Sequence, residues 1–352
     1  MLYSPVALLH ELDSGGEIPQ FLFRASYRKE FLMKLKEFYK RCIEAGIAGD
    51  RRGKALITRL LKDEKKKYDK LEGFDKECYD PERLHNPYTD CRILYGDPNT
   101  QIKCMLVGID AHADELLLAN ELRRRGKQVD VVLTHHPAGF AIKRLPEVMD
   151  IQTEQWIAFG VPTHLAEAII EEKKTWAIRQ FHVRNTDAPV DIARILDIPF
   201  MATHTPADNW AATYLQKKID RAKPRTIGDL IDLLREVPEY RYHASLQAGP
   251  TLICGSKENR AGKVYVDMTG GIMAGKNYLP ELSKRGISTL VVMHIPDDAV
   301  DKAKEEKMNI VVAGHIASDT LGMNLLLDHA LPKNVELIEC AGFKRFPRKL
   351  EK

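Results

Sequence analysis

Three short segments of this 352-residue chain place histidine beside aspartate or beside a second histidine. They are Thr134–Pro137 (THHP), His204–Asp208 (HTPAD) and His315–Asp319 (HIASD). Imidazole nitrogens and carboxylate oxygens bind Zn, Fe, Mn, Co or Ni, and none of the segments contains a cysteine thiolate. A lone histidine after a strand is usually a capping or core residue. Three such segments together predict a metal site.

The spacing within the segments favours two neighbouring ions. Adjacent side chains in a turn, such as those of His135 and His136, point in different directions, so each can serve its own ion. A carboxylate such as Asp208 can bridge two cations, and His315 and Asp319 share one face if their segment begins a helix. Two ions about 4 Å apart can activate one water and stabilise a displacement at phosphorus or carbon.

Each segment follows a predicted strand, and these strands are Val129–Leu133, Ile198–Thr203 and Asn309–Ala313. The first and third close two βαβ units, which begin with strands Ile102–Ile109 and Thr289–His294 and contain helices Asp114–Arg125 and Asp297–Lys307. Such units predict an α/β fold with parallel sheets. In open parallel sheets, ligands bind beyond the carboxyl ends of the strands, where the three segments lie.

The first part of the chain has a different pattern. Its apolar residues follow helical spacing after Ser26 and again over Lys54–Leu71, and a segment rich in Pro, Asn and Asp comes next. We therefore predict a helical hairpin extension over residues 1–87 and the α/β core over 88–352.

Composition narrows the function classes. Lys plus Arg is 53 and Asp plus Glu is 50, so the net charge of +3 gives no sign of a nucleic-acid partner. No apolar stretch reaches the roughly 18 residues of a membrane span, and the acidic start is unlike a signal peptide. We expect a cytoplasmic protein without a membrane partner.

The sequence resembles the Nif-three-like family of dinuclear-metal proteins, also labelled GTP cyclohydrolase type-two-like. The segments VGIDAHADELLLANEL…VDVVLTHHP (107–137), MATHTPADN (201–209) and VVAGHIASDTLGMN (311–324) carry the resemblance, which covers roughly residues 88–345. It implies a two-lobed fold, with parallel-rich sheets flanked by helices and two pseudo-symmetric lobes. It also implies a homo-oligomer, often a hexameric ring of dimers.

The resemblance maps the family's metal ligands onto five residues, namely His135, His136, Asp208, His315 and Asp319. The family usually has Glu at the last position. Aspartate is one methylene shorter than glutamate, so we expect a different distance between the two ions or a different bridging mode of the carboxylate. We take no GTP cyclohydrolase activity from the family label.

Two further residues are candidates beside the ions. His204 is the candidate catalytic residue for proton transfer or substrate binding, with a structural role as the alternative. Asp110 ends its strand at the same edge and either orients a ligand or caps a helix. His294 ends another strand, before Pro296, and is a lesser candidate at the same sheet edge. The run Gly270–Lys276 matches GxxxxGK without the following Ser or Thr, so it is a glycine turn into a helix or a phosphate cradle.

Three hypotheses remain. The first is a hydrolase with two divalent transition-metal ions, in which a metal-bound hydroxide attacks a phosphate ester or a nucleotide-like small molecule. The alternative is a metal carrier, sensor or scaffold without turnover. A third and weaker hypothesis is a nucleotide-binding module that uses the turn at 270–276.

Overall fold

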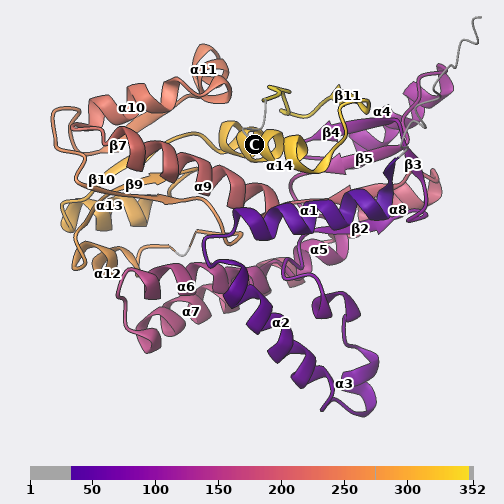
Figure 1. Ribbon diagram of the computed structural model, residues 1–352, viewed down its shortest axis with the longest axis horizontal. Helices are drawn as coiled ribbons and strands as arrows, with labels where there is room; N and C mark the ends of the chain where they lie inside the picture. The colour runs from indigo at the N-terminus through magenta and orange to yellow at the C-terminus, as the bar shows by residue number, and fades with distance from the viewer. Residues whose placement is uncertain (1–32, 274, 349–352) are drawn as a thin grey trace, which may run out of the picture. The chain divides into compact units, whose positions relative to one another are not determined.

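The computed structural model describes residues 33–273 and 275–348 as a mixed α/β protein with two main sheets (Figure 1). The five-stranded sheet has the order β11-β4-β5-β6-β2, formed by Glu336–Glu339, Cys104–Gly108, Val131–Thr134, Phe200–Ala202 and Arg92–Tyr95. The four-stranded sheet has the order β7-β10-β9-β8, formed by Thr251–Cys254, Asn309–Val312, Ile287–Val292 and Lys263–Asp267. Strands β1 (Met33–Lys34) and β3 (Gln101–Ile102) form a small separate pair.

The two main sheets share a pattern that supports the predicted two-lobed fold. Each consists of parallel strands with one antiparallel strand at an edge, β2 in one and β7 in the other. Both predicted βαβ units are present, as β4-α4-β5 and β9-α13-β10, where α4 is Ala113–Arg124 and α13 is Asp297–Glu305. Strands β2 and β11 extend the first sheet beyond the strands that we predicted.

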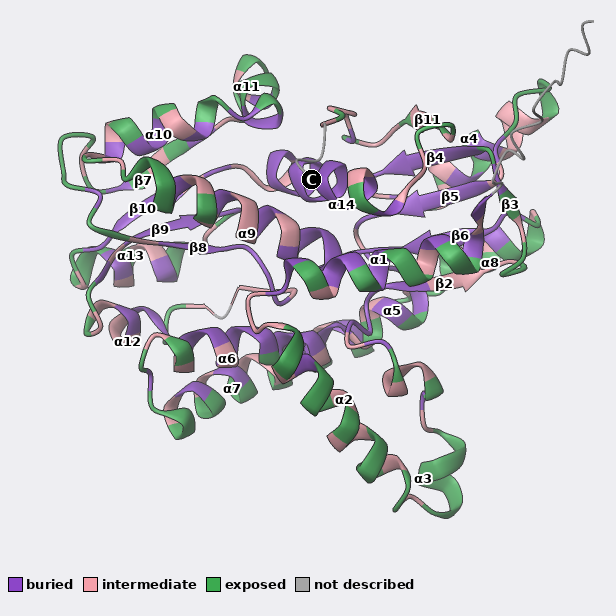
Figure 2. Cartoon of the chain, in the orientation of Figure 1, coloured by how far each residue is buried: buried purple, intermediate pink, exposed green. Residues whose placement is uncertain are grey.

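Helices cover the sheets and join them (Figures 1 and 2). Helices α1 (Leu35–Gly49), α9 (Thr205–Ala222) and α14 (His315–Ala330) pack against one another. The remaining helices are α2 (Lys54–Tyr68), α3 (Gly73–Glu77), η1 (Pro81–Leu84), α5 (Gly139–Lys143), η2 (Leu145–Met149), α6 (Asp150–Ala158), α7 (Thr163–His182), α8 (Ala188–Ile195), α10 (Ile227–Arg235), α11 (Pro238–Ser245) and α12 (Leu279–Ser283). None of the helices in the described ranges is long and apolar enough to cross a bilayer.

The two N-terminal helices have different surroundings. Helix α1 contributes Leu35, Phe38 and Cys42 to the main hydrophobic cluster, together with residues of both sheets. Helix α2 buries only Ile57 and is mostly exposed in Figure 2. The predicted start of the first helix after Ser26 lies outside the described residues, and the boundary after residue 87 stays a prediction.

Candidate metal centre

The carboxyl ends of β4, β5 and β6 meet the start of α14, which follows β10 of the other sheet. The backbone N–H of His135 donates to the Gly108 carbonyl at 3.1 Å, and that of His136 donates to the Ile109 carbonyl at 2.8 Å. These bonds continue the pairing of β4 with β5 past the strand ends. Both histidines are thus fixed at the junction of the two sheets rather than at the edge of one sheet.

Helices α9 and α14 bring the acids to this junction. Asp208 lies in the first turn of α9, where the helix N-terminus favours a negative charge. Gly314 has a φ of +104° and lets the chain turn from β10 into α14, because a Cβ at this position would lie 2.7 Å from the Ala248 carbonyl oxygen. Within α14, His315 Nε2 lies 3.5 Å from Asp319 Oδ2, so both side chains occupy one helical face.

His135 stands between the two buried acids. Its Nδ1 lies 3.2 Å from the Thr203 carbonyl oxygen, which can only accept, so Nδ1 carries the proton. Its Nε2 then turns a lone pair to Asp208 Oδ1 and Asp319 Oδ1, each 3.5 Å away. Burial lowers the pKa of His135 to about 4, against the pull of Asp319, so the ring is neutral at pH 7.

His136 repeats this arrangement with a carboxylate behind the ring. Its Nδ1 lies 2.8 Å from Asp110 Oδ1, and its Nε2 lies 3.3 Å from Asp319 Oδ2. Burial alone would lower the pKa of His136, but the hydrogen bond to Asp110 and the facing carboxylate of Asp319 raise it to about 10. Asp110 therefore holds the histidine ring, whereas His112 is the N-cap residue of α4.

The surroundings of His204 follow the same pattern, with the Asp90 carboxylate at Nδ1. Its Nδ1 lies 2.9 Å from Asp90 Oδ2, and its Nε2 lies 3.7 Å from Asp208 Oδ2. The same Asp90 oxygen accepts from the Thr205 hydroxyl at 2.6 Å and from the Thr205 N–H at 3.2 Å. Three histidines thus have Nδ1 tied to an oxygen and Nε2 aimed at an acid, which is the usual support of metal-binding imidazoles.

Several of these buried atoms have no hydrogen-bond partner among the described residues. They are His135 Nε2, Asp208 Oδ1, Asp319 Oδ1 and Asp319 Oδ2. All four are acceptors, and leaving a buried acceptor unsatisfied costs about 1–3 kcal/mol or more. Burial raises the pKa of Asp208 to about 8. Burial alone would also raise the pKa of Asp319, but the facing imidazoles hold it well below the usual range. A cation would satisfy all of these atoms at once.

The side chains form three overlapping groups that could hold metal ions. In each group the ligand atoms lie within 4.8 Å of one another, and the groups are His135, His136 and His204; His136, His315 and Asp319; and His135, Asp208 and Asp319. All five ligands predicted by resemblance, with His204, are brought together. Asp319 directs one oxygen to His135 and the other to His136 and His315, so its carboxylate belongs to two of the three groups.

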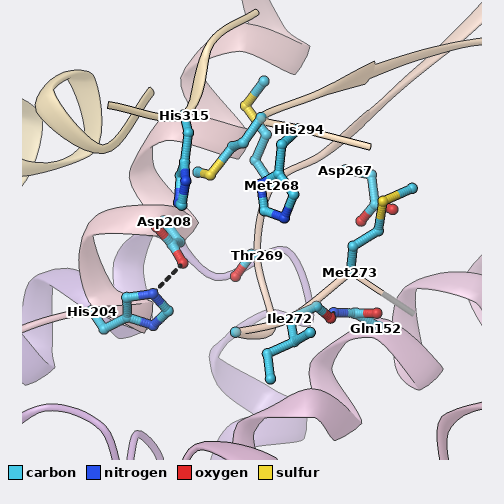
Figure 3. A pocket seen from close by; sticks show the side chains of 12 residues that line it. Gln152, His204, Asp208, Asp267, Met268, Thr269, Ile272, Met273, His294 and His315 are labelled. Carbon is cyan, nitrogen blue, oxygen red and sulfur yellow. Dashed lines mark hydrogen bonds and ion pairs between the residues drawn. The ribbon is translucent and has the colours of Figure 1, made fainter. Parts of the chain in front are cut away.

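A cavity opens beside this cluster (Figure 3). His204, Asp208 and His315 line one part of it, and the turn residues Gly271 and Ile272 line another. The glycine turn therefore faces the site, but Lys276 lies in a different depression and is 3.8 Å from Asp298. That position does not favour the phosphate cradle that the GxxxxGK pattern suggested.

Comparison with known proteins supports the fold. The structure is similar to a solved NIF3 superfamily protein from Sphaerobacter thermophilus, with 26% identity and a TM-score of 0.65 over 74% of this chain and 94% of the other. The predicted Nif-three-like assignment is confirmed. More distant solved neighbours of this NIF3-like chain include reduced HcgD from Methanocaldococcus jannaschii (15% identity, TM-score 0.42, 71% of this chain and 88% of the other) and a Bacillus cereus protein related to NIF3 (12%, 0.39, 71% and 90%).

No protein-family model and no curated protein matches the sequence. The assignment to the NIF3-like family thus rests on the structural comparison and on the segments that carry the resemblance.

Two side chains of the site were missed or underrated by sequence reasoning. Asp90 was not a candidate, because its partner His204 is 114 residues away along the chain. His294 was given little weight, yet its ring centroid lies 4.8 Å from that of His315 and it lines the cavity. The available signal for His294 was its place just beyond a strand of the second βαβ unit.

Proposed function

We propose that this NIF3-like protein holds two divalent transition-metal ions and hydrolyses a phosphate ester or a nucleotide-like small molecule. The observation that carries the proposal is the convergence of His135 Nε2, Asp208 Oδ1 and Asp319 Oδ1, buried acceptors that no described donor satisfies. Neutral imidazole and carboxylate together suit Zn, Fe, Mn, Co or Ni.

The proposed ligands divide between two ions. His135, Asp208 and Asp319 would hold one ion, and His136 and His315 with the second oxygen of Asp319 would hold the other. When bound, such ions lower the pKa of water and polarise a phosphoryl oxygen. Asp110 would keep the His136 ring in place.

The chain itself would contribute proton transfer. His204 is only 6% exposed, its Nε2 faces Asp208, and it lines the cavity where a substrate would sit. Asp90 fixes the proton on Nδ1, so Nε2 is left to accept a proton from the attacking water or to bind the substrate.

A hydrolysis assay on metal-stripped and reloaded protein tests this proposal. We expect the reloaded protein to release p-nitrophenol from bis(p-nitrophenyl) phosphate, or phosphate from nucleotides, and the His135→Ala/His136→Ala variant to lose this activity. Inactivity across the panel, together with readily exchanging metal, would contradict hydrolysis and favour the carrier or sensor alternative. The 41% exposure of the His315 side chain would suit such exchange.

The assembly and the surroundings of the protein are further parts of the proposal. We propose a cytoplasmic homo-oligomer, with the hexameric ring that the family resemblance implies and a small-molecule substrate as the main partner. Light scattering of the full chain would give the mass of a hexamer if this is correct, and the mass of a monomer would contradict it.

A further inference from the structure

The cavity beside the metal centre has a second wall that none of the proposed ligands forms. Gln152 of α6 and Asp267 of β8 lie on this wall, away from His204 and Asp208 (Figure 3). They are buried, at 1% and 9% exposure. Three methionines, Met268, Met273 and Met293, line the same cavity.

The hydrogen bonds of Asp267 leave one of its oxygens short of a donor. The Tyr278 hydroxyl donates to Oδ2 at 2.7 Å. The Tyr265 hydroxyl lies 2.7 Å from Gln155 Oε1 and 3.5 Å from Asp267 Oδ1. A phenol has one proton, and the shorter contact with Gln155 takes it. Asp267 Oδ1 is therefore a buried acceptor without a full hydrogen bond.

The guanidinium of Arg51 does not supply a hydrogen bond to Asp267 Oδ1. Arg51 influences the Asp267 carboxylate electrostatically, but its terminal nitrogens donate to the backbone carbonyls of Val266 and Ala212. The charge of Asp267 is thus partly balanced, whereas its Oδ1 has only the long contact with the Tyr265 hydroxyl. A neutral N–H group suits this position better than a second cation, because Arg51 would repel a cation.

Gln152 presents a second free acceptor. Its Nε2 donates to the carbonyls of Gly270 and Ile272 at 3.1 and 2.7 Å, and these two bonds fix the orientation of the amide. Its Oε1 is buried and has no partner among the described residues. The wall therefore carries two acceptor oxygens, from Gln152 and Asp267, beside the flexible apolar surface of the methionines.

We propose that this wall binds a primary amide or an aromatic amino group, both neutral N–H donors, carried on an apolar, planar body. This inference deepens the proposed function and rests on it for one point only, which is that the other end of the same molecule reaches His204, Asp208 and His315. The N–H bonds would be donated to Gln152 Oε1 and Asp267 Oδ1, and the apolar body would lie against the methionines.

A matched pair of probes tests the inference on the full chain. Benzamide and acetophenone have nearly the same shape, but only benzamide has N–H donors. We expect benzamide to bind metal-loaded protein at least about tenfold more tightly in isothermal titration, since two new hydrogen bonds are worth that factor or more. Equal affinities, or no binding of either probe, would overturn the inference.

Variants test whether the preference for benzamide comes from this wall. In Asp267→Asn the preference for benzamide should fall to about a few-fold. The substitution replaces one acceptor oxygen of the carboxylate by an amide nitrogen, which is a donor and cannot accept the N–H of benzamide. The exposed Asp232→Asn should keep the full preference, since the side chain of Asp232 is 78% exposed. An undiminished preference in folded Asp267→Asn would overturn the site. Should that variant fail to fold, Gln152→Leu removes the other acceptor and carries the same expectation.

Running the titration and the hydrolysis assay on the same metal-loaded protein separates this inference from the proposed function. A preference for benzamide in metal-loaded protein that hydrolyses none of the panel substrates would support the wall and contradict the hydrolase. Hydrolysis with equal affinities for the two probes would contradict the wall alone.

Discussion

Asp90 and His204 form a buried pair that joins the segment before β2 to the start of α9. Asp90 is fully buried, and its Oδ2 lies 2.9 Å from His204 Nδ1. Two further bonds from Thr205 hold the same oxygen. The imidazole is therefore fixed with Nε2 toward Asp208 and the cavity, as a proton-transfer residue requires.

Removing this pair should lower turnover more than metal content. We expect Asp90→Asn, which keeps an acceptor but loses the charge, to reduce kcat about tenfold, and Asp90→Ala to reduce it about a hundredfold. Steady-state kinetics and elemental analysis of the same samples check both quantities. Asp232→Asn is the exposed control. Unchanged kcat in folded Asp90→Ala would contradict the role of His204.

Metal uptake should release protons at pH 7. Burial alone would lower the pKa of His136, but the hydrogen bond to Asp110 and the facing carboxylate of Asp319 raise it to about 10, and burial raises the pKa of Asp208 to about 8. Both groups hold a proton in the metal-free protein at pH 7, whereas His135, with a pKa of about 4, does not. Metal ions bind the deprotonated forms, so they must displace these protons.

The sign of the pH dependence follows from those raised pKa values. Metal affinity should increase as the pH rises from about 6 to about 9, because fewer protons then have to be displaced. Isothermal titration in two buffers of different ionisation enthalpy should show about two protons released at pH 7. Uptake without proton release, or weaker binding at higher pH, would contradict the proposed ligands.

The close packing of α9 and α14 predicts a coupling between stability and metal binding. A Cβ at Gly322 would lie 2.5 Å from the Ala207 carbonyl oxygen, so Gly322→Ala must push apart the helices that carry Asp319 and Asp208. We expect the free energy of unfolding to fall by about 1–3 kcal/mol in urea titrations, and metal affinity to fall with it.

Gly228→Ala is a matched control for this change. The nearest atom to a Cβ at Gly228 is 3.5 Å away, which is ordinary contact, and the residue lies in α10. Alanine there should be neutral or stabilising by up to about 1 kcal/mol. Equal stability of the two variants would contradict the argument from helix packing.

The regular part of the fold could be predicted from the sequence, because its signals are local. Buried runs such as Val131–Thr134 alternate with helices of ordinary length, and the Thr226–Asp229 capping box marks the start of α10. Strands β2 and β11 were missed. They are four residues long and only partly buried, so their pairing partners rather than their own composition define them.

The site residues also divide into those that spacing in the sequence predicts and those that only the fold brings together. His315 and Asp319 are four residues apart, and helical geometry alone predicts their shared face. The pairing of Asp90 with His204 depends on the sheet that brings β2 beside β6, and no spacing in the sequence encodes it. The wall formed by Gln152 and Asp267 likewise requires α6 and β8 to be placed together before it can be seen.

Elemental analysis of the purified full chain beside the His135→Ala/His136→Ala variant tests the central claim most directly. We expect about two transition-metal ions per chain in the native protein and a loss of at least one in the variant, because each ion would lose a histidine ligand. No transition metal in the native protein, or equal metal in both proteins, would contradict the metal centre.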